Sequence, residues 1–394
     1  MPTDDTPRGP LSGLTVVDLT RILAGPYATM LLADLGARVI KVELPGQGDD
    51  TREVGPFIEH ETGGRTSAYF ASVNRNKESI ALDLKAEADR AIFERLLDRA
   101  DVLVENFRPG VMHKLGYGWE AIHARWPRLV MASISGFGQT GPYRELHAYD
   151  MVVQAMSGVM SITGPEGGPP VRVGVSIGDL AAGMFGAIGI QSALLERVHS
   201  GRGRHVDVAM FDGQVALLEN ALARLQVDGQ APQPIGTRHP SITPFAVFQA
   251  REGALVIAAG NDAMFGRLCK TIGRPELPAD PRFARNGDRS RHHDALRIAL
   301  EQALQARPAA EWVALLREAG IACGPLNDVA ALRDDPQVRA RHMLVDLALP
   351  GGGTLAVAGC PLKFDAEPAP RFRAAPQLDQ HRGALLAELG LAPA

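Results

Sequence analysis

Short apolar runs alternate with amphipathic ones over the first 200 residues, and this alternation constrains the fold more than any other feature. Leu14–Leu19, Ala37–Glu43 and Leu129–Ser135 are rich in aliphatic residues and predict strands. Gly25–Leu35 and Ala86–Arg99 have apolar residues at helical spacing. A chain that runs β-α-β-α in this way is expected to form an α/β fold with a mostly parallel, doubly wound sheet. Ligands of such sheets bind at the carboxyl ends of the strands.

The loops that follow these predicted strands are rich in Gly, Pro, Asn and Arg, as ligand-binding loops often are, although plain turns share this composition. They are Thr20–Pro26, Glu43–Asp50, Glu105–Gly110 and Gly136–Pro142. No GxGxxG motif follows the first strand, which argues against a standard dinucleotide site. Basic residues in and near the loops would suit a phosphate-bearing ligand, although each alone is more often a surface charge. These are Arg75, Lys77, Lys85, Arg108 and Lys114.

The later part of the chain predicts a second, smaller α/β domain. A Gly/Pro/Gln stretch, Asp228–Gly236, has the composition of a linker. We expect residues 1–205 to form the large domain, 206–235 a linker, and 236–334 the small domain with its return linker. The residues alone leave open which domain the C-terminal segment 335–394 packs against.

The bulk composition favours a cytoplasmic enzyme. The net charge of the 394 residues is −4, so no basic field favours nucleic acid or an anionic membrane as a partner. The three cysteines are far apart and suggest neither a metal site nor a disulfide framework. The N-terminus lacks the pattern of a signal peptide. The apolar segment 173–195 contains several glycines and predicts a buried core helix rather than a membrane span.

Asp179 is the only charged residue between Val173 and Leu195. A carboxylate in such surroundings must be hydrogen-bonded, pushed toward neutrality, or used in chemistry. The local pattern favours an N-cap for a helix Leu180–Arg197. The alternative is a nucleophile held at a helix N-terminus, and both roles are compatible with the same position. Asp150 likewise precedes a helical pattern and has the pattern of an N-cap.

An ordered set of segments resembles the class III CoA-transferases, also called the CaiB/BaiF family, over essentially the whole chain. The matching segments are Leu19–Pro26, Gly36–Glu43, Gly48–Thr51, Asn74–Ile80, Val104–Phe107, Gly136–Pro142, Tyr149 with Asp150, and the Asp179 segment. Within the family, the chain is most similar to the branch that moves CoA between dicarboxylic acids, including succinyl-CoA:glutarate-type enzymes. The segments shared with that branch are Thr20–Pro26, Val73–Lys77, Ile162–Pro165, Pro170–Arg172, Gly236–Pro244, Ala259–Asn261 and Gly324–Asn327.

The resemblance implies a fold, an assembly and a site. Both chain ends would build one large Rossmann-like domain, which assigns 335–394 to it, and two subunits would form an interlocked homodimer. Asp179 would be the nucleophile, with acyl-CoA and small carboxylic acids as substrates and no permanently bound cofactor or metal. The residues implied to hold CoA are Leu23, Ala24, Leu82, Asp83, Leu84, Lys85, Asn106, Phe107, Arg108, Lys114, His147, Tyr149 and Asp150.

Some positions depart from the formyl-transferring members of the family. Leu23 and Leu44 replace a glutamine and an arginine, and a glycine run is missing near 260, which argues against formyl or oxalate as the acyl group. A dicarboxylate needs a cation for its far carboxylate. The candidates are Arg21, Arg52, Arg75 and Arg238 with His239 beside it, and Arg75 and Arg238 are favoured by their place in the shared segments.

Two other functions stay open from the sequence. Acyl-CoA racemases of the same family use a histidine where this chain has Tyr149, and an ordinary tyrosine is a poor general base at neutral pH. His147 lies close enough in sequence to keep that alternative open. A non-catalytic CoA-binding protein is the second alternative. The presence of Asp179 together with the basic loop residues that would suit a phosphate argues against it.

Overall fold

The computed structural model describes residues 9–60, 63–350, 352–365 and 372–391. The chain divides into two compact units, and each is described by itself. Unit 1 comprises Met1–Val159, Arg172–Asp228 and Pro336–Ala394, and unit 2 comprises Met160–Val171 and Gly229–Asp335. Residues 206–228, which we predicted to be a linker, therefore belong to unit 1. Residues 160–171, which we predicted to be part of the large domain, belong to unit 2.

A parallel sheet of six strands forms the centre of unit 1. Its order is β5-β2-β1-β6-β7-β8, and every neighbouring pair is parallel. The strands are β1 (Thr15–Asp18), β2 (Arg38–Glu43), β5 (Lys77–Ala81), β6 (Val102–Glu105), β7 (Val130–Ser135) and β8 (His205–Ala209). The strand order reverses between β1 and β6, and such a switch point is where parallel α/β sheets bind ligands.

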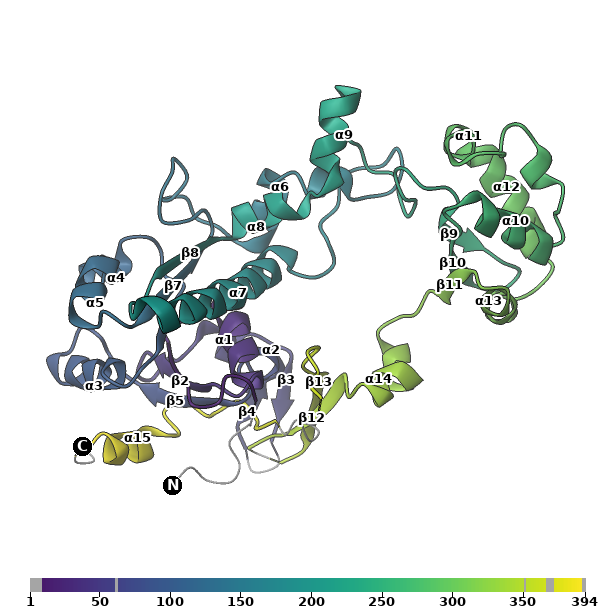
Figure 1. Ribbon diagram of the computed structural model, residues 1–394. Helices are drawn as coiled ribbons and strands as arrows, with labels where there is room; N and C mark the ends of the chain where they lie inside the picture. Colours follow the sequence, from purple (N-terminus) through teal and green to yellow (C-terminus); the bar gives the residue numbers. More distant parts are fainter. Residues whose placement is uncertain (1–8, 61–62, 351, 366–371, 392–394) are drawn as a thin grey trace. The chain divides into compact units, whose positions relative to one another are not determined.

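Helices cover both faces of this sheet, as expected for a doubly wound fold. Alternate strand residues such as Val16 and Val39 face α1 (Ala24–Asp34) and α7 (Ile177–Ser200) in one apolar cluster. Figure 1 shows α7 running beside α1. The opposite set of strand residues packs with α3 (Glu87–Leu97), α5 (Trp119–Arg125) and α15 (Arg382–Glu388) in a second cluster. By length and composition alone α7 could cross a membrane, but half of its most apolar stretch is buried in the protein.

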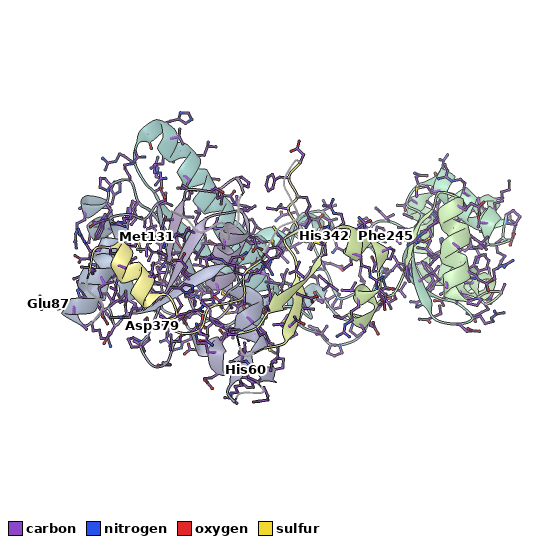
Figure 2. The ribbon with its side chains drawn as sticks, turned by 90° about the horizontal axis from the view of Figure 1, so that it is seen from below. His60, Glu87, Met131, Phe245, His342 and Asp379 are labelled. Carbon is purple, nitrogen blue, oxygen red and sulfur yellow. The ribbon has the colours of Figure 1, made fainter. Side chains whose placement is uncertain are left out.

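The C-terminal segment covers the edge strand β5, which settles a point that the residues alone left open. Asp379 Oδ1 accepts a hydrogen bond from Ala81 N at 2.7 Å, and the His381 ring Nδ1 accepts one from Ser79 N at 3.1 Å. Figure 2 shows Asp379 next to the yellow C-terminal helix, α15. These bonds occupy edge N–H groups that would otherwise lack a partner strand.

Several elements of unit 1 differ from the sequence predictions. The strand Lys77–Ala81 overlaps only the start of the short apolar run Ile80–Leu84. The residues Asp212–Val227, whose pattern predicts one helix, lie in two helices that break at Glu219, where φ is 50°. The sequence also missed some short elements. The α-helices and β-strands described for unit 1 and not given above are β3 (Phe57–Glu59), β4 (Arg65–Ser67), α2 (Ala68–Val73), α4 (Val111–Lys114), α6 (Asp150–Met156), α8 (Met210–Leu217), α9 (Asn220–Asp228), α14 (Pro336–Ala340), β12 (Leu344–Ala348) and β13 (Thr354–Ala358).

Unit 2 has its own core around an antiparallel sheet of three strands in the order β11-β10-β9. Phe248, Phe265 and Trp312 are among the buried residues of that core. The strands are β9 (Phe245–Gln249), β10 (Ala254–Ala258) and β11 (Ala322–Pro325), and the helices are α10 (Asp262–Thr271), α11 (Asn286–Arg291), α12 (His293–Leu304) and α13 (Ala309–Glu318). The unit thus has the mixed α/β composition that the sequence predicts.

Candidate active site

Asp179 lies in the first turn of α7, and the prediction that it caps this helix is wrong. The helix begins at Ile177, with Ser176 at the N-cap position. The helix starts early because a side chain from α6 takes over the capping role: Asp150 Oδ1 accepts a hydrogen bond from Gly178 N at 2.8 Å. Asp150 is therefore not the N-cap of its own helix either, since that position is Tyr149. The Asp179 side chain is left free for another purpose.

The electrostatic environment of Asp179 disfavours its charge. Among the described residues, no hydrogen bond or ion pair is recorded for this half-buried carboxyl group. Burial, and to a smaller extent the nearby charge of Asp150, together raise its pKa to about 7. A carboxylate with a raised pKa is more basic than an ordinary one and titrates in the range where enzymes work.

Two glycines of α7 let other groups approach the helix closely. A Cβ on Gly178 would lie 2.2 Å from Gln214 Nε2, and one on Gly183 would lie 2.8 Å from the carbonyl oxygen of Ala24. Gly183 is one turn beyond Asp179 on the same face of the helix. The start of α1, with Leu23 and Ala24, is thereby brought against the nucleophile end of α7.

The loop between β1 and α1 is held in a strained conformation. Ile22 has φ of 71°, which is unfavourable for a β-branched residue. Its N–H donates to Asp49 Oδ1 at 3.2 Å. The Asn106 side chain binds both backbone groups of Arg21, accepting from its N–H at 2.8 Å and donating to its carbonyl at 2.7 Å. Strain that persists because several neighbours impose it is common at functional sites.

A buried ion network lies beneath that loop. Lys77 Nζ is 3.0 Å from Asp18 Oδ2, and Lys41 Nζ is 2.9 Å from Asp49 Oδ2, with all four side chains fully buried. Lys41 Nζ also donates to the carbonyl oxygen of Thr20 at 2.6 Å. Lys77 is thus a structural residue, and our sequence interpretation of it as a phosphate ligand is wrong, because its ammonium group has no access to solvent.

A pocket opens at the carboxyl ends of β1, β2, β5 and β6, where the switch point predicts a ligand. Its volume is about 220 Å³, and its walls are mainly aliphatic. The predicted CoA residues Leu82, Asp83, Leu84, Lys85 and Phe107 all line it. Leu44 lines it too, and Arg21 lies over the Phe107 ring with 5.3 Å between the guanidinium carbon and the ring centroid.

The other predicted CoA residues have mixed placements. Arg108 and His147 come together, with 2.9 Å between the guanidinium and the ring Nδ1. Lys114 is exposed at the end of α4, and Tyr149 is 74% exposed at the start of α6. Asn106 differs from the expectation, because its hydrogen bonds hold the Arg21 backbone rather than leaving the side chain for a ligand.

Arg75 was predicted to bind the acid substrate, and the structure contradicts this role. Its side chain is buried, with 2.6 Å between Nη2 and Asp34 Oδ2 and 2.5 Å between Nη1 and the carbonyl oxygen of Ala358. We therefore correct Arg75 to a structural residue, since its donors are used. Arg238 pairs with Glu166, and the His239 ring stacks on Phe245. Both belong to unit 2, so their assignment to the site stays a prediction.

Two residues near Asp179 were missed by the sequence analysis. Tyr69 on α2 belongs to the same small apolar cluster as Leu23 and Leu180, and burial raises its pKa, with Asp179 the largest charge that adds to the effect. Arg172 is 45% exposed and approaches Asp150 Oδ2 to 3.9 Å. Its place in a segment shared with the dicarboxylate branch was a signal, but only the fold brings that side chain close to Asp150 of α6.

Comparison with known proteins identifies the family. The model of the CoA-transferase family III matches residues 11–382, and the chain belongs to this family. It is 50% identical to the acetyl-CoA:oxalate CoA-transferase of Acetobacter aceti over 98% of this chain and 97% of that protein. It is 39% identical to the succinate–glutarate CoA-transferase of Agrobacterium fabrum over 96% of each chain. The chain is therefore a CoA-transferase of family III.

The solved structures agree. A CaiB/BaiF family protein from Brucella suis superposes with a TM-score of 0.85 at 41% identity, covering 97% of this chain and 99% of that one. The α/β fold with a parallel sheet, predicted from the alternation of strands and helices, is confirmed. From Leu23 and Leu44 we expected that oxalate is not a substrate. This expectation has no support from the Acetobacter aceti relative, which is named for oxalate.

Proposed function

We propose that this protein moves CoA from an acyl-CoA to a dicarboxylic acid through covalent intermediates on Asp179. The observation that carries the proposal is the half-buried Asp179 carboxyl group at the start of α7, which has no recorded partner among the residues that the structure describes and a pKa raised to about 7. Relatives named for oxalate, glutarate and mesaconate transfer support the dicarboxylate class. Succinyl-CoA is our favoured donor, and acetyl-CoA is the alternative suggested by the Acetobacter aceti relative.

We place the adenosine end of CoA in the pocket at the strand ends. Its aliphatic walls and the Phe107 ring suit a planar base, and the cations Arg21 and Lys85 suit the phosphates. The thiol end would then pass Leu23 and Ala24, which are close to the nucleophile end of α7. Backbone N–H groups at the start of α1 are the natural donors for a developing oxyanion.

The proposed reaction has two symmetric halves. A carboxylate oxygen of Asp179 attacks the thioester carbon of the donor, the carbon–sulfur bond breaks, and CoA leaves as a thiolate, which gives a mixed anhydride. The thiolate then attacks the aspartyl carbonyl carbon and releases the first acid as its carboxylate, which leaves Asp179 as a thioester of CoA. Covalent catalysis splits one difficult exchange into easier steps in this way.

The second acid reverses the sequence. Its carboxylate attacks the aspartyl thioester and expels CoA thiolate, and the thiolate then attacks the acyl carbon of the new anhydride. The products are the new acyl-CoA and free Asp179. Both intermediates hydrolyse if water reaches them. The apolar cluster of Leu23, Tyr69 and Leu180 around the site supports the exclusion of water.

The racemase alternative is less well supported. It requires a general base near the acyl α-carbon, and this chain offers Tyr149 and His147. The Tyr149 side chain is 74% exposed, and the His147 ring contacts the Arg108 guanidinium. A neighbouring permanent cation makes a histidine a weaker base, because it disfavours the positively charged, protonated ring.

We also propose that the enzyme works as a homodimer. The outer face of α7 carries apolar side chains that the single chain leaves exposed: Met184, Phe185, Ile188, Leu195 and Val198. Further exposed apolar residues, Met151 and Met156, lie on α6. Apolar surface of this extent on a soluble protein usually marks an association surface. Light scattering after size-exclusion chromatography should give the mass of a dimer, and a monomer at micromolar concentration would contradict the proposal.

The deciding experiment incubates the protein with succinyl-CoA or acetyl-CoA and a panel of acids that includes oxalate, glutarate and mesaconate. New thioesters are identified by mass spectrometry. With the donor alone, the intact protein should gain the mass of a CoA adduct, and peptide mapping after trapping should place it on Asp179. If no acid of the panel yields a new thioester and no adduct forms, the proposed function is wrong.

A further inference from the structure

We propose that Arg172 binds the far carboxylate of the acid substrate and so selects dicarboxylic over monocarboxylic acids. The inference rests on the proposed function and names the residue that gives it specificity. It replaces the sequence hypothesis for Arg75, which the structure places in a buried ion pair with Asp34.

Arg172 is joined to the nucleophile through a short series of contacts within unit 1. Its guanidinium is 3.9 Å from Asp150 Oδ2, and the other oxygen of Asp150 binds Gly178 N, next to Asp179. The backbone around Arg172 is fixed as well, because Val173 N donates to Gln154 Oε1 at 2.9 Å. Gln154 Nε2 in turn donates to Asp150 Oδ2 at 2.7 Å. The arginine therefore stands at a defined place beside the start of α7.

The donors of Arg172 are still available. The contact with Asp150 is long for an ion pair, and Asp150 already accepts hydrogen bonds on both oxygens. No hydrogen bond is recorded for the Arg172 guanidinium within the described ranges, and the side chain is 45% exposed. A guanidinium has five N–H donors in a planar fork that fits a carboxylate bidentately.

The other arginine candidates of unit 1 are less suited. Arg52 binds Glu43 with both Nε and Nη2, at 2.8 and 2.7 Å. Arg21 lines the pocket that we assign to the adenosine end of CoA. Arg172 is the candidate that combines available donors with a contact to the residue that caps the helix of the nucleophile.

The chemistry explains the pairing with Asp150. A free guanidinium beside the site needs a counter-charge when no acid is bound, and Asp150 supplies it at a distance that a substrate carboxylate can outcompete. A far carboxylate bound by Arg172 would fix the acid with its other carboxylate toward Asp179. A monocarboxylic acid of equal length lacks this anchor.

The test compares Arg172→Met with the wild type, using acetyl-CoA as a donor that has no far carboxylate. Succinate and butyrate serve as acceptors, since they differ only by a carboxylate in place of a methyl group. We expect the KM for succinate to rise about 10- to 100-fold, as for loss of a charged hydrogen-bonding pair, with the KM for acetyl-CoA unchanged and the discrimination against butyrate reduced. Arg172→Lys should restore part of the loss.

Arg204→Met is the matched control, because this exposed arginine pairs with Glu196 near the far end of α7. An unchanged succinate KM in Arg172→Met overturns the inference. An equal loss toward acetyl-CoA, succinate and butyrate also overturns it, since that pattern indicates a structural role through Asp150. Failure of the wild type to transfer CoA to any dicarboxylate removes the proposed function, and this inference falls with it.

Discussion

Two buried carboxylates of unit 1 and one half-buried carboxylate have pKa values that are shifted in opposite directions. Asp18 and Asp49 lie beneath the β1–α1 loop, each paired with a buried lysine and bonded to hydroxyl or backbone donors, and their pKa values are lowered. Within the part of the chain that the structure describes, Asp179 has no such partner, and burial is the main cause that raises its pKa to about 7. The paired carboxylates shape the site and the unpaired one is available to react. The difference shows how one domain separates structural charges from chemical ones.

We expect the largest effect on activity from replacing the unpaired carboxylate, Asp179. Asp179→Ala should lower CoA transfer by about 10⁴-fold or more, because a covalent route cannot proceed without its nucleophile. CoA should still bind, since the pocket at the strand ends is untouched. Steady-state transfer assays and calorimetric titration with CoA measure the two quantities. Transfer that persists in the variant would remove Asp179 from the nucleophile role.

A change in the paired set should damage folding instead. Lys77→Met leaves Asp18 with one buried countercharge fewer, and we expect the free energy of unfolding to fall by about 3–5 kcal/mol. Lys114→Met, at an exposed lysine of the same unit, should stay within about 0.5 kcal/mol. Urea unfolding of both variants decides the point. Equal effects would mean that the buried network is not the structural element that we describe.

Neutralising Asp179 should stabilise the protein, whereas removing the Lys77 charge should destabilise it. Its folded-state pKa of about 7 exceeds the ordinary value of 3.8, so the ionised form costs stability above pH 7, and the cost fades as pH falls toward 4. Asp179→Asn should therefore raise the free energy of unfolding by up to about 4 kcal/mol at pH 8, and by less at pH 5. Thermal unfolding at the two pH values gives the measurement. A gain that is independent of pH would contradict the raised pKa.

The smallest effect concerns the pH profile of transfer. The reactive form of Asp179 is the carboxylate, so kcat/KM should rise with pH through about 7. Asp150→Asn keeps an acceptor for Gly178 N but removes a negative charge that raises the Asp179 pKa, and the rising limb should move to lower pH. A limb that stays in place would mean that burial alone sets the Asp179 pKa.

The sequence predicted much of the fold because the periodic segments are strong. The main strands and helices of the first 200 residues form within a few residues of their expected positions, and the parallel doubly wound sheet follows from their alternation. Short elements such as β3 and β4 were missed, since three-residue strands carry little periodic signal. The break at Glu219 was missed because the apolar pattern runs through it.

The candidate site was predicted only in part. Leu82–Lys85 and Phe107 do share a pocket, because all follow parallel strands that end at the same sheet edge. The roles of Asn106, Arg75 and Lys77 were misjudged, since a polar residue in a loop motif looks the same whether it holds the backbone or a ligand. Each is decided by a partner far away in sequence.

The sequence by itself determined the family, the α/β sheet and the unusual isolation of Asp179 among apolar residues. Only the tertiary structure decided that Asp179 is not a cap, because the group that caps α7, Asp150, comes from another helix 28 residues away from Gly178 in the chain. The same fold pairs Asp18 and Asp49 with buried lysines. The sequence does not show how deeply a carboxylate is buried or which groups pair with it. These two properties decide whether the carboxylate stabilises the fold or performs chemistry.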